Sequence, residues 1–134
     1  LENLKSEESA KIAKELGIKT PPDQAPECLI CHSTGWGTPT GYQLGVDPMD
    51  KKAFKKNTGL SRVGCESCHG AGSLFKSKKK MKAIRAGDLK ASDFGLMEIN
   101  EKTCTVCHNP DSPTYKTFEY DVRIKDIVHP IPEK

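Results

Sequence analysis

The chain is poor in the residues that build a hydrophobic core. Only 35% of its 134 residues are hydrophobic and 6% are aromatic, while eleven glycines and nine prolines interrupt regular structure. It contains no stretch of 18 apolar residues, so the sequence predicts no membrane span. The formal net charge of +3 is too small to indicate nucleic-acid binding. A chain of this length forms one domain at most, and this one would bury a poor core by itself.

Six cysteines stand out because each belongs to a Cys-x-x-Cys-His pattern, which occurs at residues 28–32, 65–69 and 104–108. This pattern is the attachment signature of c-type haem. Two thiols three residues apart project from one side of a helical turn and can add to the two vinyl groups of a porphyrin, while the next histidine gives the iron its proximal nitrogen. The predicted attachment residues are Cys28, Cys31, Cys65, Cys68, Cys104 and Cys107, and the predicted proximal ligands are His32, His69 and His108.

Two other uses of paired cysteines fit less well. Structural zinc takes four ligands, usually from two pairs, so three pairs would leave one without a partner and the histidines without a role. Disulfides within each pair would close short, strained loops. The sequence therefore predicts three covalently attached haems, whose apolar plates would supply the core that the chain lacks. Their propionates would also shift the net charge in the acidic direction.

We expect a mainly α fold with little regular structure, a haem-cored multihaem cytochrome c forming a single trihaem domain over residues 1–134. Residues 1–19 hold an N-terminal helix, and the proline-rich residues 20–26 form a linker. A second helix is predicted over 47–56, with Asp47 as N-cap and Pro48 in its first turn. Further helices are predicted over 73–86, ending before Gly87, and over 117–128, where Pro130 stops the helix near His129.

Histidine is too scarce to ligate every iron twice. Three bis-histidine haems need six histidines, and the chain has four, so His129 is the single one left after the proximal ligands. It lies at the end of the last predicted helix and is predicted to be a distal ligand, although a surface histidine would fit the same position. The remaining irons need methionine, a weaker ligand, a neighbouring chain, water or nothing.

Met49 and Met97 precede haem motifs at loop-like positions and are candidate thioether ligands, while Met81 lies on a helical stripe that favours packing. Filling gaps in an irregular core is the alternative for all three. The lysine cluster of residues 76–82 is either a solvated helix face or a docking patch for an acidic redox partner. Its members are Lys76, Lys78, Lys79, Lys80 and Lys82.

Several stretches together resemble the tetrahaem cytochrome c-554 family. They are residues 13–18, 28–37, 63–73 and 104–113, with Phe118, Tyr120 and a histidine at the end of the closing helix. The resemblance implies haems stacked in close pairs that pass electrons between oxidoreductases. It also implies that His129 is the distal ligand of the middle haem, on Cys65 and Cys68.

The chain departs from this family in two ways. It has three haem motifs where the family has four. Family members also commonly carry a histidine shortly after the Gly-x-Gly-Ser of the middle motif, where this chain has Leu74, Phe75 and Lys76. The first and third haems therefore have no obvious distal histidine.

These patterns favour electron transfer by a soluble trihaem c-type cytochrome that shuttles electrons between redox partner proteins. The alternative is binding or reduction of a small ligand (nitric oxide, nitrite, hydroxylamine or peroxide) at a haem without a strong distal ligand. No constellation of acid–base groups points to an enzyme. A homo-oligomer whose chains lend each other ligands would also satisfy the histidine deficit. Because haem is attached outside the cytoplasmic membrane, we expect a periplasmic or extracellular protein, with Leu1 beginning a mature or trimmed exported chain.

Overall fold

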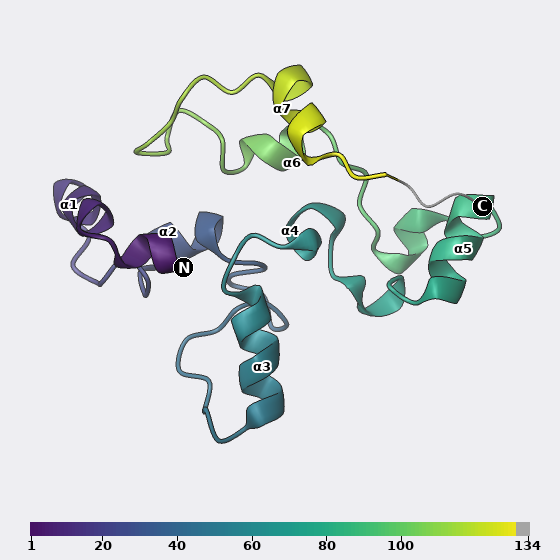
Figure 1. Cartoon of the computed structure of the whole chain (residues 1–134), viewed down its shortest axis with the longest axis horizontal. Helices are drawn as coiled ribbons and strands as arrows, with labels where there is room; N and C mark the ends of the chain where they lie inside the picture. The colour runs from purple at the N-terminus through teal and green to yellow at the C-terminus, as the bar shows by residue number, and fades with distance from the viewer. Residues whose placement is uncertain (131–134) are drawn as a thin grey trace. The chain divides into compact units, whose positions relative to one another are not determined.

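The computed structural model describes residues 1–130, which are helical and irregular and contain no strand (Figure 1). The mainly α fold with little regular structure is therefore confirmed. The α-helices are α1 (Glu7–Glu15), α2 (Pro26–His32), α3 (Lys51–Leu60), α4 (Cys65–His69), α5 (Lys78–Ala86), α6 (Glu101–Thr105) and α7 (Tyr120–Ile127). Short 3-10 helices lie at Glu2–Lys5 (η1), Gly72–Leu74 (η2) and Ala91–Phe94 (η3).

The chain forms two compact units, one over residues 1–98 and one beginning at Ile99. The first unit holds α1 to α5 and the first two Cys-x-x-Cys-His motifs, and the second holds α6, α7 and the third motif. The expectation of a single trihaem domain over residues 1–134 stays a prediction. No helix within residues 1–130 combines the length and the apolar composition needed to cross a membrane.

The N-terminal segment folds as η1 followed by α1. Ser6 separates the two helices and caps α1, because its side-chain oxygen accepts a hydrogen bond from the backbone N–H of Ser9 at 3.2 Å. Beyond α1, Gly17 adopts a φ of +71°, and the N–H of Ile18 donates to the carbonyl of Ala13. This left-handed turn ends the helix and leads into the segment before α2.

The start predicted for the helix over residues 47–56, which is α3, was wrong by about one turn. The side chain of Asp47 accepts a hydrogen bond from the N–H of Met49 at 2.8 Å. This bond to the backbone two residues further on forms an Asx turn, which aspartate commonly adopts. Asp50 is the N-cap instead, accepting from the N–H of Ala53 at 3.0 Å. The helix also continues beyond its predicted end at residue 56 and ends at Leu60.

The other two predicted helices begin later than expected. Residues 73–86 divide into η2 and α5, because the side chain of Ser77 accepts from the N–H of Lys80 and starts a new helix. Its predicted end before Gly87 is confirmed, with Gly87 at a φ of +85°. The last helix begins at Tyr120 and ends at Ile127, next to the predicted stop, with Val128 already extended.

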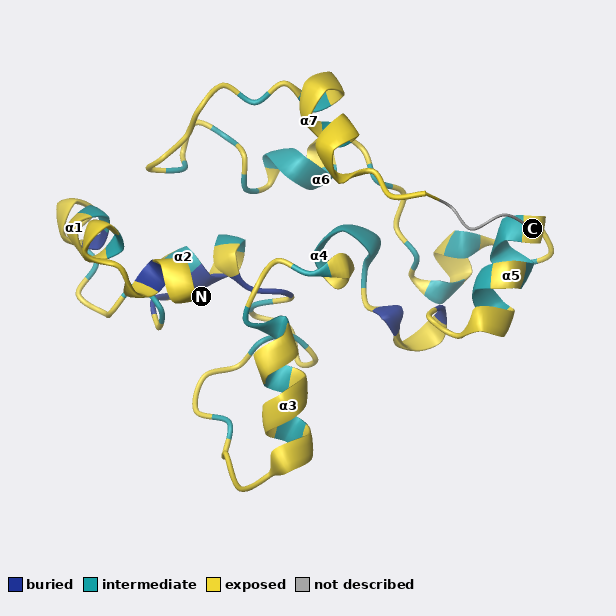
Figure 2. Cartoon of the chain, viewed as in Figure 1, coloured by how far each residue is buried: buried dark blue, intermediate teal, exposed yellow. Residues whose placement is uncertain are grey.

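The polypeptide buries very little apolar surface of its own (Figure 2). The buried hydrophobic residues within 1–130 are Leu4, Ala13, Ala25, Leu29 and Phe75. Many large apolar side chains are exposed, including Ile30, Val63 and Val106. The small core expected from the composition is what the described residues form.

Replacing Leu29 with alanine is expected to lower the free energy of unfolding by about 2–5 kcal/mol, because truncating a buried leucine leaves a cavity. Leu29 is 0% exposed, the largest fully buried side chain of the described residues. Urea denaturation of the holoprotein measures the change. The control is Leu16→Ala, at a leucine that is 55% exposed, which should cost about 1 kcal/mol or less. Equal losses in the two variants would contradict this account of the core.

Candidate haem-binding sites

The first motif lies on α2, whose seven residues begin with Pro26 at the first helical position. Cys28 and Cys31 are one turn apart on this helix and therefore lie on the same side of it. Burial, with smaller contributions from Glu27 and Cys31, raises the pKa of the Cys28 thiol. The helix ends at His32, where the hydroxyl of Ser33 donates to the carbonyl of Leu29 at 2.7 Å.

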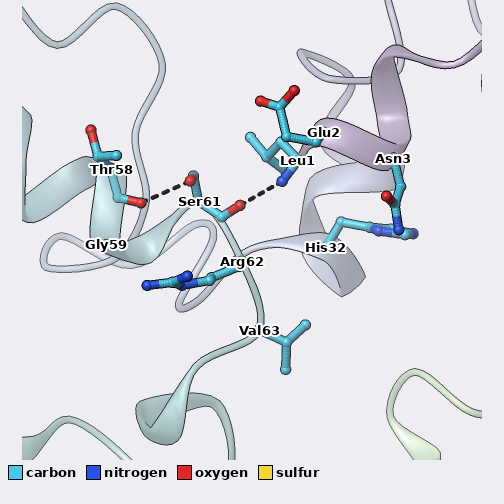
Figure 3. Close-up of a pocket in the computed structure, with 9 residues that line it drawn as sticks. All are labelled: Leu1, Glu2, Asn3, His32, Thr58, Gly59, Ser61, Arg62 and Val63. Atoms are coloured by element: carbon cyan, nitrogen blue, oxygen red, sulfur yellow. Dashed lines mark hydrogen bonds between the residues drawn. The ribbon is translucent and has the colours of Figure 1, made fainter.

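His32 lines a cavity of about 550 Å³ within the first unit (Figure 3). Its walls come from η1, the end of α3 and the residues that lead to α4, among them Arg62 and Val63. Although the His32 side chain is exposed to this space, neighbouring atoms remove part of its water and lower its pKa, and the amino group of residue 1 adds a smaller effect. A lowered pKa favours the neutral imidazole, which is the form that binds a metal.

The second motif occupies all of α4, a helix of five residues. Glu66 turns the chain after this helix, because its carboxylate accepts a hydrogen bond from the N–H of Gly72 at 2.7 Å. Gly70 ends the helix with a φ of +80° and a ψ of 172°, a conformation that is nearly restricted to glycine.

Met97 lies beside this second motif. Its backbone N–H donates to the carbonyl of His69 at 3.0 Å. A Cβ on Gly70 would lie 3.2 Å from the Met97 Cγ and 2.5 Å from the carbonyl oxygen of Gly95. Thus the structure brings one of the two candidate methionines against a haem motif. The other, Met49, lies in the turn before α3 with its residue 84% exposed.

The third motif begins on α6 and continues into the turn that follows it. Asn100 caps this helix in a reciprocal capping box with Thr103. The helix ends at Thr105, and the N–H groups of Cys107 and His108 both donate to the carbonyl of Cys104, at 3.2 and 3.0 Å. A helical turn therefore presents this motif, as expected for haem attachment.

The ring of His108 stacks on Phe118, with centroids 4.6 Å apart and planes 14° from parallel. Irregular residues 109–117 lie between the two, so periodicity in the sequence gives no signal for this contact. An aromatic ring lying flat on the imidazole restricts its rotation. Phe118 is therefore a supporting residue of the third motif that the motif itself does not reveal.

His129 follows α7 in the second unit, where its residue is exposed and its Nδ1 lies 3.5 Å from the carbonyl oxygen of Pro130. Its assignment as distal ligand of the middle haem stays a prediction.

The exposed apolar side chains fit c-type haem. Ile30 lies between the two cysteines of the first motif and Val106 between those of the third, and they are 58% and 67% exposed. Uncovered apolar surface beside paired thiols and an imidazole suits a large apolar ring held by thioether bonds. The cavity beside His32 falls within the range of about 300–1,000 Å³ found for sites that bind ligands. Within residues 1–130, no three His, Cys, Asp or Glu side chains form a group arranged to hold a bare metal ion.

Comparison with known proteins gives an independent result. The family model described as "Cytochrome c554 and c-prime" matches residues 1–70, which include the first two motifs. Cytochrome c-554 of Nitrosomonas europaea is 28% identical over 134 aligned residues, which cover 78% of this chain and 51% of the relative. The chain thus spans about half the length of that curated relative. No solved structure matches the chain.

Replacing Gly70 with alanine is expected to lower the free energy of unfolding and the haem content of the holoprotein. Backbone strain alone should cost about 1–3 kcal/mol, and the new Cβ would also press on the carbonyl of Gly95. Urea denaturation and the haem-to-protein absorbance ratio measure the two effects.

The matched control for this variant is Gly87→Ala. Gly87 has a similar φ of +85°, but a Cβ there would meet no atom within 4 Å. It should cost about 1–2 kcal/mol from backbone strain and leave the haem content unchanged. The account of Gly70 fails if the two variants behave alike.

Proposed function

The chain belongs to the cytochrome c554 and c-prime family, and we propose that it is a trihaem c-type cytochrome that transfers electrons between redox partner proteins. The observation that carries this proposal is the threefold Cys-x-x-Cys-His pattern, presented each time by a helical turn, on α2, on α4 and at the end of α6. The family match covers the first two of these motifs. The similar protein of Nitrosomonas europaea bears the name cytochrome c-554, which supports the same chemistry here.

In this proposal the cysteines and the histidine of each motif have different roles. The two thiols, Cys28 with Cys31, Cys65 with Cys68 and Cys104 with Cys107, hold one porphyrin each. His32, His69 and His108 hold the irons on the proximal side. Haem supplies reversible one-electron transfer when bound. The protein sets each reduction potential through the axial ligands, the exposure of the site and the surrounding hydrogen bonds.

Few side chains of this chain are candidates for the distal ligand of an iron. We assign His129 to the middle haem on the strength of the family resemblance. Met97 and Met49 remain the thioether candidates for the other irons. Met97 lies beside His69 and Gly70 at the second motif, so its assignment to the first or third iron requires that haem to pack against this motif. A methionine ligand would raise the potential of its haem relative to a bis-histidine haem.

One observation favours a second function. Four histidines cannot fully ligate three irons, so a haem without a strong distal ligand would be open to small molecules such as nitric oxide, nitrite, hydroxylamine or peroxide. Reduction of such a ligand also needs positioned proton donors. Electron transfer needs no positioned proton donors, and we therefore propose it as the first function.

The lysines of residues 76–82 offer a docking face for an acidic partner. Lys78, Lys79 and Lys82 project from α5 and are exposed. Lys80 is engaged differently, since its ammonium lies 3.6 Å from the centroid of the Phe94 ring. A face of one sign of charge raises the rate at which an oppositely charged partner arrives.

A periplasmic or extracellular location is consistent with covalent haem attachment and completes the proposal.

The proposal predicts a holoprotein mass equal to that of the chain plus three haems. It also predicts that carbon monoxide leaves the visible spectrum of the dithionite-reduced protein unchanged, because in a carrier a second axial ligand occupies the sixth position of every iron. Fewer than three haems would refute the trihaem assignment, and a shifted spectrum would favour ligand binding.

His129→Ala tests the distal ligand in the same experiment. This variant should acquire a carbon monoxide response at one haem, because the sixth position of that iron opens. The matched control is Lys125→Ala on α7, which should keep the parent spectrum. A His129→Ala protein that also keeps the parent spectrum would rule out ligation by His129.

Reversing the charge of two exposed lysines tests the docking face. The double variant Lys78→Glu and Lys79→Glu should be reduced by an acidic flavodoxin more slowly at low salt, by about tenfold or more. The difference should shrink at 0.5 M salt, because salt screens the attraction. Stopped-flow absorbance at the haem bands measures the rate.

The exposed lysines of α3 provide a control with the same change in net charge. Lys52→Glu with Lys55→Glu alters another helix of the same unit. If both double variants slow reduction equally, net charge and not the α5 face controls the encounter.

A further inference from the structure

Thr34 joins the first Cys-x-x-Cys-His motif to the second. It follows His32 by two residues, and its residue is only 4% exposed. Its hydroxyl lies 2.6 Å from the carbonyl oxygen of Arg62, 2.9 Å from the N of Gly64 and 3.1 Å from the hydroxyl of Ser67. Gly64 immediately precedes α4, and Ser67 lies inside the second motif. One side chain therefore touches the approach to α4 and its first turn.

The hydrogen-bond count fixes the direction of these contacts. A threonine hydroxyl has one hydrogen and two lone pairs. The hydrogen goes to the carbonyl of Arg62, so Thr34 accepts from the N–H of Gly64, and the hydroxyl of Ser67 must be the donor in the remaining pair. All three bonding positions of the Thr34 hydroxyl are then in use.

The backbone of Thr34 is held as firmly as its side chain. Its N–H donates to the carbonyl of Leu60 at the end of α3, and its carbonyl accepts from the N–H of Tyr42, both at 2.9 Å. The close approach also depends on Gly64, where a Cβ would lie 3.3 Å from the threonine oxygen. Hydrogen bonds that use all three positions of the Thr34 hydroxyl thus join the two motifs, although Thr34 and Ser67 are 33 positions apart in the sequence.

We propose that Thr34 is the positioning residue that fixes the first and second haem-attachment motifs relative to each other, and so sets the coupling between the first and middle haems. This inference rests on the proposed function, because it takes both motifs as sites of haem attachment. Both proximal histidines lie within two residues of a partner in this set, His32 before Thr34 and His69 after Ser67. A change in the set therefore moves one attachment site against the other.

Thr34→Val tests the proposal in the holoprotein, because valine keeps the shape of threonine and removes the hydroxyl. The coupled circular dichroism of the Soret band, which reports the distance and angle between neighbouring haems, should change in form. The amide hydrogen of Gly64 should exchange about fivefold to tenfold faster, as expected on loss of one ordinary hydrogen bond. Haem content, measured by mass, should stay at three.

Two further variants separate positioning from folding. Thr34→Ser keeps the hydroxyl and should restore both the parent Soret signal and the parent exchange rate. Ser67→Ala removes one of the three bonds and should give a smaller change of the same kind. The matched control is Thr38→Val, in the same segment, which removes a 2.7 Å bond to the carbonyl of Gly35 and touches neither motif. It should leave both signals unchanged.

The inference is overturned if Thr34→Val lowers stability but keeps the parent Soret signal, because the residue would then be structural alone. It is also overturned if Thr38→Val changes that signal as much as Thr34→Val does. A parent protein with fewer than three haems would instead refute the trihaem assignment of the proposed function, and the exchange rate of Gly64 would still show whether Thr34 holds the second motif.

Discussion

The fold depends on one constraint, which is that this polypeptide cannot cover its own apolar side chains. Leu29 is fully buried, whereas Ile30 beside it is exposed, as are Val63 and Val106. A chain in this condition gains stability from any large apolar group held against it, since burial of apolar surface is the main favourable contribution to folding. Covalent attachment keeps such a group bound even when the small core of the polypeptide unfolds locally.

The helices are accordingly short, and two of them, α2 and α4, end at the histidine of the motif that they carry. The second motif is coextensive with α4, and the first ends with α2. Helices of five to seven residues are unstable alone. Caps and cross-links sustain them here, including the carboxylate of Glu66 on Gly72 and the capping box of Asn100. These contacts stabilise the turns that carry the second and third motifs.

Local signals in the sequence were read well where one residue determines the outcome. Gly87 ends α5 because it has no Cβ to resist a left-handed conformation. Asp47 misled the prediction, because Asp47 and Asp50 both suit an N-cap and neighbouring backbone geometry decides between them. Ser77 starts α5, although Ser73 suits a helix start equally well in the sequence.

The sequence by itself determined the chemistry: three pairs of thiols, each followed by an imidazole, need only the local geometry of a helical turn. It also determined that the four histidines of the chain are too few to give three irons two histidine ligands each, because this follows from composition alone. Tertiary structure alone decided that Met97 lies beside Gly70, that Phe118 stacks on His108 and that Thr34 bonds to Ser67 of the second motif. These contacts join segments that lie 10 or more positions apart in the sequence. No periodic pattern encodes them, because they depend on how the connecting loops close in space.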